Sequence, residues 1–377
     1  MDWSYYNPVK IFMYDLPTFQ TRLAGVFEGK RLGLLVSRRS VRDYGLDSVI
    51  AALAAQNAVT IIDNIPSNPT FESIYDGLSL FGATQPEALI AIGGGSTIDT
   101  AKAISAVSAD WPQSLPQFYQ VVKSKSYQKA VGGIPIVAVP TTAGSGADLT
   151  MWGTVWDAVG KQKYSVEAPW LYPAQSWIVP QLTATLPVRL TLATGLDALS
   201  HATEAYWSTR SNVIVREHAR AAIRLITGAL AQAMERPQDM EARSRMCRGA
   251  LFAGLAFSNT RTTACHGLSY PLTLHFGIAH GFAVALTLYE VLALNWPAVE
   301  EKGEFLAAWG VREPREIKVW LDTVSAPTQK LRLSAFGVSV DDAKSVLLGS
   351  SLVRERMGNN PVELSADTIA RIIGNIQ

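Results

Sequence analysis

The stretch ALIAIGGGSTIDTAKAISAV, residues 88–107, has the pattern of a buried strand, a glycine loop and the first turns of a helix. Glycines at such a junction let the backbone approach a ligand closely, and the N–H groups at a helix N-terminus favour a bound phosphate. The loop lacks both the GxGxxG fingerprint of dinucleotide-binding turns and the GK[ST] of a P-loop. The residues alone leave two interpretations open, a phosphate-binding loop and a tight turn.

Similar apolar runs occur on both sides of this stretch, at residues 31–37, 58–63 and 134–140, and helical stretches separate them. Strands that are apolar at nearly every position are typical of a parallel sheet covered on both faces. The last run continues into a second loop, VPTTAGSGAD at 139–148, which again supplies hydroxyls and glycines. Two such loops at the ends of parallel strands suit a dinucleotide that lies across the carboxyl edge of the sheet.

The second half of the chain has a different pattern. After about residue 184 the strand signals stop, and helical periodicity takes over, as at 215–234 and 244–259. Because 377 residues exceed the usual limit of a single core, we expect two domains. We predict an α/β domain with a parallel sheet at 1–183 and an all-α domain at 184–377, with the boundary in the proline-flanked VPQLTATLP.

Composition narrows the function classes. Lys and Arg number 33 and Asp and Glu 32, a balance that provides no broad basic field, so we expect no nucleic-acid partner. Two cysteines are too few for a disulfide framework, and the N-terminal MDWSYYNPVK has no signal-peptide pattern, which indicates a cytoplasmic protein. The apolar stretch at 282–296 contains Glu290 and is too short to span a bilayer, so we expect a buried helix and no membrane.

The histidines of the second half suggest a metal site. In GLDALSHATEAYW, Asp197 precedes His201 by four positions, so a helix places both on one face, where they could share a proton or a metal. His266 and His280 are each followed by glycine, which leaves room beside the imidazole. Three histidines and one carboxylate suit Fe(II), Zn(II) or a similar divalent ion. An ordinary hydrogen bond on a solvated helix face is the alternative for the first pair.

Several motifs, taken in order and spacing, resemble the iron-containing (group III) alcohol dehydrogenases, which share the architecture of the dehydroquinate synthases. They are GGGSTIDTAK, VPTTAGSGAD, GLDALSHATEAY, HGLSYPL with AHG, and the SNP and NNP turns at 67–69 and 359–361. The resemblance implies an α/β dinucleotide-binding domain, a helical domain, and iron or sometimes zinc in the cleft between them. The matching ligand positions are Asp197, His201, His266 and His280. The metal would act as a Lewis acid while NAD(P)H reduces an aldehyde to a primary alcohol.

The resemblance also implies a set of cofactor-binding residues. It assigns the pyrophosphate to Gly93, Gly94, Gly95 and Ser96, lets Asp99 order the start of the helix, and lines the cofactor with Asn68, Thr141, Thr142, Ser145 and Lys163. After the first predicted strand the chain carries Arg38 and Arg39, where NAD-preferring members tend to have an aspartate. Because arginine can bind a 2′-phosphate, we expect NADPH to be preferred over NADH.

A second departure concerns proton transfer. Many family members carry another histidine four residues after the third ligand, and this chain has Tyr270 there. Tyr270 with water could pass the proton, as could His275, and Tyr270 could equally be part of the pocket wall.

The substrate side resembles one branch of the family more closely. The segments WSYYNPVKI and SNTRTTACHGLSYPLTLHFGIAHG are similar to those of members that reduce phosphonoacetaldehyde to 2-hydroxyethylphosphonate in phosphonate biosynthesis. Arg261 could bind the phosphonate if a helix end turned it inward, and a salt bridge is its alternative role; Trp152 could shape the same pocket. Other alcohol, diol or glycerol dehydrogenases, a dehydroquinate synthase-like lyase and a protein with a structural metal are the rival functions. The family further implies a homodimer, with WSYYNPVKIFMY as the partner strand.

Overall fold

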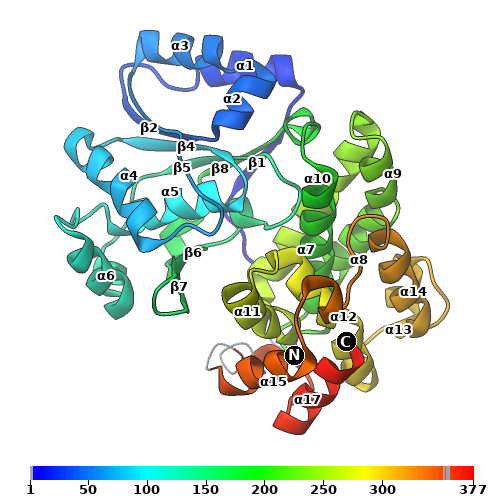
Figure 1. Ribbon diagram of the computed structural model, residues 1–377. Helices are drawn as coiled ribbons and strands as arrows, with labels where there is room; N and C mark the ends of the chain where they lie inside the picture. Colours follow the sequence, from blue (N-terminus) through cyan, green and yellow to red (C-terminus); the bar gives the residue numbers. More distant parts are fainter. Residues whose placement is uncertain (1–2, 351–352, 354–356) are drawn as a thin grey trace. The chain divides into compact units, whose positions relative to one another are not determined.

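The computed structural model describes residues 3–350, 353 and 357–377, and the chain divides into two compact units (Figure 1). The α/β unit comprises Pro8–Thr142 and Ala147–Thr185. The helical unit comprises Leu186–Gln377, the N-terminal segment up to Asn7, and the short segment Ala143–Gly146. The main boundary therefore follows residue 185, where the sequence pattern placed it after 183, and two short segments join the helical unit from earlier in the chain.

The α/β unit is built on one parallel sheet of six strands. Their order is β1 (Lys10–Met13), β8 (Gln175–Ile178), β5 (Ile136–Pro140), β4 (Ala88–Gly93), β2 (Arg31–Val36) and β3 (Ala58–Ile62). The four predicted strands are β2 to β5, and the predicted fold class is confirmed. The apolar pattern missed β8 and the antiparallel hairpin of β6 (Trp152–Asp157) and β7 (Gln162–Glu167), and it did not identify β1, which lies in the segment that the family resemblance suggested as a partner strand.

Side chains on the two faces of this sheet belong to two separate hydrophobic cores. Along β2, Leu34 and Leu35 point into different cores, and Ile90 and Ala91 do the same along β4, as the two-residue period of a strand requires. Helices α1 (Leu16–Ala24), α2 (Arg38–Tyr44) and α3 (Asp47–Gln56) pack on one face. Helices α4 (Phe71–Thr84), α5 (Gly95–Val107) and α6 (Leu115–Ser124) pack on the other, as Figure 1 shows. Double coverage explains why nearly every strand position is apolar.

The helical unit contains no strand among its described residues. Its central helix is α7 (Val188–Trp207), which packs against α8 (Val213–Thr227), α10 (Met240–Thr260) and α12 (His280–Asn295). The remaining helices are α9 (Leu230–Glu235), α11 (Ala264–Phe276), α13 (Lys302–Trp309), α14 (Pro314–Ser325), α15 (Val340–Gly349) and α17 (Ala366–Asn375). The predicted helix at 215–234 is interrupted at Gly228, which separates α8 from α9.

The stretch His280–Ala298 is long and apolar enough to cross a membrane by length and composition alone. However, 61% of its apolar window is buried inside the protein, and α12 packs against α7, α11 and α17. The stretch is therefore a core helix, as predicted.

Candidate metal centre and cofactor loops

Helix α7 carries a carboxylate and an imidazole on one buried face. Asp197 is 6% exposed and His201 is 5% exposed, so neither lies on a solvated surface. The Nδ1 atom of His201 lies 3.9 Å from Oδ1 of Asp197, which is too long for a hydrogen bond. The interpretation of this pair as an ordinary surface hydrogen bond is therefore wrong. Burying two such groups in a core helix is unfavourable unless a partner satisfies them.

The other two predicted ligands come from neighbouring helices and approach the same oxygen atom. The Nε2 atom of His266, on α11, lies 3.5 Å from Oδ1 of Asp197, and Nε2 of His280, at the start of α12, lies 3.9 Å from it. One ligand atom each from Asp197, His201 and His266 lies within 4.8 Å of the others. His280 stands at the margin of this group, with 30% of its side chain exposed. The structure thus brings all four residues together.

Three atoms of this cluster lack the hydrogen bonds that buried polar atoms normally have. They are Oδ1 of Asp197, Nδ1 of His201 and Nε2 of His266. Such orphaned atoms are rare in folded proteins and call for an explanation. Histidine nitrogens and a carboxylate oxygen that face one another are a suitable ligand set for Fe(II) or Zn(II), so these residues fit the metal that the sequence implied.

Burial and neighbouring charges leave His201 neutral at neutral pH, whereas His266 keeps its proton until a metal displaces it. Burial lowers the pKa of His201 to about 4, so its imidazole is neutral at neutral pH, as a ligand must be. Burial would raise the pKa of Asp197, but His201, His266 and His280 hold this pKa well below its usual range. Burial also opposes a charge on His266, whereas the Glu204 and Asp197 carboxylates raise its pKa to about 10.

Gly281, after His280, was expected to leave room for a ligand beside the imidazole, but the structure gives it a role in helix packing. A Cβ atom on Gly281 would lie 1.8 Å from the carbonyl oxygen of Ala193 on α7. Only glycine therefore allows α12 to begin against the backbone of α7. Gly281 provides space for helix packing, which in turn brings His280 towards Asp197, and it is not explained by ligand access.

The structure separates the two candidates for proton transfer. The ring of Tyr270 stacks parallel to that of His280, with centroids 5.6 Å apart and planes 4° apart, and it is buried. His275 is exposed in the last turn of α11. Tyr270 is thus the residue placed beside the cluster.

In the α/β unit, the first glycine loop combines both interpretations suggested by the sequence. A Cβ atom on Gly93 would lie 2.1 Å from Oγ1 of Thr97, so this glycine is required by the tight turn. Gly94 is the N-cap of α5 and no side chain caps this helix. The first N–H groups of α5, at Gly95 and Ser96, therefore have no side-chain cap, as the predicted phosphate-binding role requires.

Two other loops lie directly against this turn. The N–H of Thr141, after β5, donates to the carbonyl of Gly93 at 2.9 Å. The N–H of Asn68, which has a left-handed backbone (φ 56°), donates to Oγ of Ser96 at 3.3 Å. The methyl group of Thr142 would lie 3.3 Å from a Cβ atom on Gly94. The structure therefore groups these predicted cofactor residues at the carboxyl ends of β4 and β5.

Asp99 does not order the start of α5. Its carboxylate accepts hydrogen bonds from the backbone and hydroxyl of Thr154 in β6, close to Lys102 and Lys163. Burial raises the pKa of Asp99 to about 6. Asp99 therefore ties α5 to the hairpin, where Lys163 lies in β7.

Lys102 is a buried residue of this region that sequence reasoning missed. Its Nζ donates to the carbonyl oxygens of Thr150 at 2.6 Å and of Trp152 at 2.8 Å. It thus anchors the start of β6, which contains Trp152. Its position three residues after Asp99, on one helix face, is the signal that could have identified it.

The remaining predicted residues are divided between the units. Ser145 lies in the short segment Ala143–Gly146 of the helical unit. Arg261 directly follows α10 in the helical unit, whereas Trp152 belongs to the α/β unit.

The two arginines expected near the adenosine ribose both have intramolecular partners. Arg38, the first residue of α2, donates from Nε and Nη2 to the Asp63 carboxylate at 2.8 and 3.1 Å. Arg39 forms a pair with Asp43 one helical turn later, with Nε 3.3 Å from Oδ2. Both pairs lie within the α/β unit.

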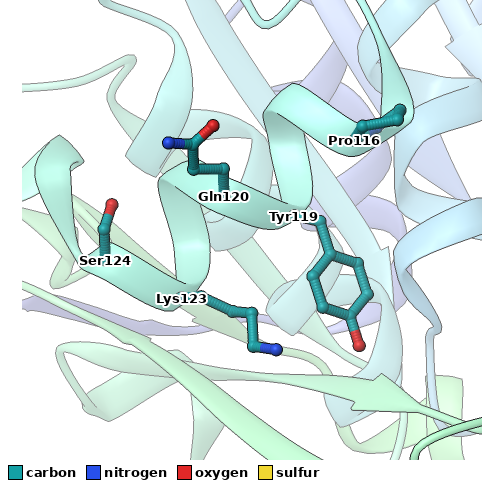
Figure 2. A pocket seen from close by; sticks show the side chains of 5 residues that line it. All are labelled: Pro116, Tyr119, Gln120, Lys123 and Ser124. Atoms are coloured by element: carbon teal, nitrogen blue, oxygen red, sulfur yellow. The ribbon is translucent and has the colours of Figure 1, made fainter.

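An open surface hollow of about 600 Å³ lies along α6. Figure 2 shows its lining side chains on this one helix: Pro116, Tyr119, Gln120, Lys123 and Ser124. The Lys123 ammonium lies 5.0 Å from the centre of the Tyr119 ring. Because no predicted ligand or cofactor residue lines this hollow, we do not assign the chemistry to it.

The helical unit has a cluster of metal-ligand residues, and the α/β unit has a glycine loop of the kind that binds a dinucleotide. Together these features are typical of a metal-dependent, dinucleotide-linked oxidoreductase. Residues 19–180 match the sequence model of the iron-containing alcohol dehydrogenases, and residues 191–376 match that of the C-terminal part of the Fe-containing alcohol dehydrogenase family. The chain belongs to this family, and it is an alcohol dehydrogenase or aldehyde reductase. The resemblance found in the sequence motifs is confirmed.

Individual relatives show the range of the family. The chain is 32% identical to the phosphonoacetaldehyde reductase of Streptomyces viridochromogenes over 86% of this chain and 84% of the relative. It is 33% identical to the lactaldehyde reductase of Escherichia coli over 73% of this chain and 71% of the relative. A crystal structure of a 1,3-propanediol oxidoreductase superposes with a TM-score of 0.86 at 27% identity and covers 100% of both chains. The sulfoacetaldehyde reductase of Bifidobacterium kashiwanohense, solved with NAD+, shares the fold (TM-score 0.85, 24% identity, 100% of this chain and 99% of that chain).

Proposed function

We propose that this enzyme reduces phosphonoacetaldehyde to 2-hydroxyethylphosphonate. The observation that carries the proposal is the backbone of Arg261, which lies between α10 and the helix of the ligand His266. The similarity to the Streptomyces viridochromogenes enzyme over most of both chains supports the same substrate. A general alcohol, diol or glycerol dehydrogenase of the same family is the second candidate, favoured by the comparable identity to lactaldehyde reductase.

Arg261 adopts a conformation that side chains rarely tolerate. Its φ of 62° and ψ of −178° lie in a region occupied almost only by glycine, at a cost of about 1–3 kcal/mol. The surroundings enforce it, because the amide of Asn359 donates to the carbonyls of Thr260 at 3.3 Å and Thr262 at 3.4 Å. An arginine kept where glycine would be unstrained supports a role for its side chain.

That role matches the charge of the proposed substrate. The planar guanidinium of arginine binds phosphonate oxygens in a two-pronged fashion, with charge-assisted hydrogen bonds. A simple alkyl aldehyde offers no partner for it. Arg261 thus accounts for selectivity towards an anionic aldehyde, whereas the cluster around Asp197 acts on the carbonyl end.

The chain's own residues divide the remaining work. Asp197, His201, His266 and His280 would hold the divalent metal, and the N-terminus of α5 would hold the pyrophosphate. When bound, the metal supplies a Lewis acid for the carbonyl oxygen and the dinucleotide supplies the hydride. Tyr270, stacked on His280, holds a phenolic proton beside the cluster for the alcohol product.

We propose NADPH as the preferred dinucleotide. Arg38 and Arg39 begin α2 directly after β2, where the adenosine ribose is bound in folds of this class. Arg38 already holds a carboxylate with two parallel hydrogen bonds, a geometry that also suits a 2′-phosphate. The test is the ratio of kcat/KM for NADPH and NADH, and an equal or higher value with NADH would overturn this preference.

We also propose a homodimer in the cytoplasm. Strand β1 lies at the edge of the sheet, pairs with β8 alone among the described strands, and exposes Ile11, Phe12 and Met13. An exposed apolar edge strand is a ready site for pairing with a second copy. Sedimentation of Phe12→Glu beside wild type tests it, since a dimer should dissociate in the variant and a wild-type monomer would contradict the proposal. The buried Cys247 and Cys265 form no disulfide in the described part of the chain, which agrees with a reducing compartment.

The substrate test compares aldehydes in the metal-loaded enzyme. Phosphonoacetaldehyde, acetaldehyde and glyceraldehyde are offered at equal concentration to wild type, Arg261→Lys and Arg261→Gly. We expect wild type to prefer phosphonoacetaldehyde, and Arg261→Gly to raise its KM at least tenfold while leaving acetaldehyde reduction within about twofold. Arg261→Gly should also unfold at a higher temperature, because the strain is relieved. Equal use of all three aldehydes by wild type would instead identify a general alcohol dehydrogenase.

A further inference from the structure

Glu204 is a fully buried carboxylate of α7 that the predicted ligand set does not include. It is 0% exposed and follows Asp197 by seven residues and His201 by three, which places all three on one helix face. An ionised side chain in such a position is rare unless it is paired and hydrogen-bonded. Both of its oxygen atoms have hydrogen-bond partners on or next to α11.

One oxygen contacts the imidazole of a metal-ligand candidate. Oε2 of Glu204 forms a close hydrogen bond with Nδ1 of His266. A carboxylate only accepts, so the ring must carry its hydrogen on Nδ1. The nitrogen that faces Oδ1 of Asp197, at 3.5 Å, is then Nε2, and this atom has a free lone pair once a metal displaces its proton.

The other oxygen holds the backbone on which His266 is carried. Oε1 of Glu204 accepts from the hydroxyl of Thr263 at 2.7 Å, from the N–H of Cys265 at 2.7 Å and from the N–H of His266 at 3.4 Å. Thr263 is the N-cap of α11 but does not cap it with its own side chain. Glu204 therefore supplies the missing cap from another helix, and its charge suits the positive end of α11.

We propose that Glu204 is the positioning residue of the metal centre, which fixes both the ring and the backbone of His266 so that Nε2 faces Asp197. This inference rests on the proposed metal site. One carboxylate sets the tautomer, the ring orientation and the start of α11 together. Partners of this kind behind a ligating histidine typically change metal affinity by 10- to 100-fold when they are removed.

Glu204 could act only as a structural helix cap, and a matched control variant distinguishes this role from positioning of the His266 ring. Glu204→Gln keeps the size of the side chain, but its single acceptor oxygen cannot serve both the ring and the backbone donors. Thr263→Val removes the hydrogen bond to the same carboxylate, together with the one that the Trp207 indole donates to the hydroxyl at 2.9 Å, and leaves the contact with Nδ1 of His266 intact. Glu204→Asp keeps the charge but withdraws the carboxylate from the ring by one carbon.

The experiment measures the dissociation constant for Zn(II) by chelator competition, the visible absorption bands of the Co(II)-loaded protein, and thermal stability after treatment with a chelator. We expect Glu204→Gln to weaken Zn(II) binding about 10- to 100-fold and to shift the Co(II) bands. Thr263→Val should lower stability while its Zn(II) affinity stays within about twofold of wild type. If Glu204→Gln fails to fold, Glu204→Asp gives the same readouts, with at least a tenfold loss of affinity expected.

Unchanged Zn(II) affinity and Co(II) bands in the folded Glu204 variants would overturn the inference and leave only a structural cap. Equal losses of affinity in Glu204→Gln and Thr263→Val would overturn it as well. A wild-type protein that binds neither ion would refute the metal site itself, a distinct result that would remove the basis of the inference. A change of substrate preference has no influence on any of these readouts.

Discussion

The two units differ in which part of the chain, side chains or backbone, supplies the candidate chemistry. In the helical unit it resides in side chains, with Asp197, His201 and His266 directed at one point from buried helix faces. In the α/β unit it resides in the backbone, where Gly94 opens an uncapped helix N-terminus at the end of a strand. Side chains can be removed one at a time without moving the helix that carries them. A substitution can impair a backbone site only by changing the conformation of its loop.

The largest expected effect is the loss of a side chain from the helical unit. We expect Asp197→Asn to lose most of its bound metal and to reduce aldehydes about 10³-fold more slowly, because a Lewis acid contributes several kcal/mol to the reaction. Metal content and kcat are the measurements. Dinucleotide affinity, followed by fluorescence titration, should stay within about twofold if the two units hold separate functions.

His218→Asn is the control for this prediction. His218 also lies in the helical unit, packed against Phe252 and Tyr5, and it has no part in the cluster. Its variant should keep both metal and activity. Full metal content in Asp197→Asn would contradict the assignment of Asp197 as a ligand.

The same difference explains how much the sequence could predict. The sequence alone allows the metal ligands to be predicted, because ligands must be particular residue types at particular spacings. They are Asp197, His201, His266 and His280. Glu204 stands in the same printed motif, yet its role depends on the return of α11 to α7, 62 residues later in the chain. No local pattern reports such a contact.

Strand prediction failed for a related reason. Strands β2, β4 and β5 are buried and apolar at nearly every position, which made them recognisable in the sequence. Strand β1 is apolar at three of its four positions although all four are exposed at the edge of the sheet, and a run of four residues is too short to be recognised as a strand from its pattern. The hairpin of β6 and β7 consists mainly of polar or mixed residues, and its contacts with α5 cannot be inferred from its own sequence.

The next effect concerns packing within the helical unit. Gly281→Ala would place a methyl group 1.8 Å from the carbonyl of Ala193, so α12 must shift away from α7 and His280 must shift with it. We expect a loss of about 1–3 kcal/mol of stability in urea unfolding, together with weaker metal binding. Gly303→Ala, with no atom within 4 Å of its new Cβ, is the control and should be neutral or stabilising. Equal behaviour of the two variants would show that the close helix contact is not present.

A pair of glycines tests the backbone site of the α/β unit. Gly93→Ala should lower stability, because its Cβ would lie 2.1 Å from Oγ1 of Thr97. Gly94→Ala meets only the flexible end of Thr142 at 3.3 Å, so it should fold well but raise the KM for the dinucleotide about tenfold, equivalent to about 1.4 kcal/mol. Metal content should be unchanged in Gly94→Ala. If dinucleotide KM is also unchanged, the loop is only a tight turn.

The smallest effect concerns a side-chain pair of the α/β unit, Arg38 and Asp63. Asp63 occupies the guanidinium fork of Arg38, so a 2′-phosphate must compete with its carboxylate for the same donors. The pair is exposed and therefore weak, so Asp63→Asn should improve kcat/KM with NADPH by no more than about fivefold. Activity with NADH should not change. Asp43→Asn, which releases Arg39 in the same way, is the matched variant and shows which arginine responds. A selective loss with NADH in Asp63→Asn would have the opposite meaning: Asp63 would then bind the ribose hydroxyls, and the α/β unit would depend on a side chain as directly as the helical unit does.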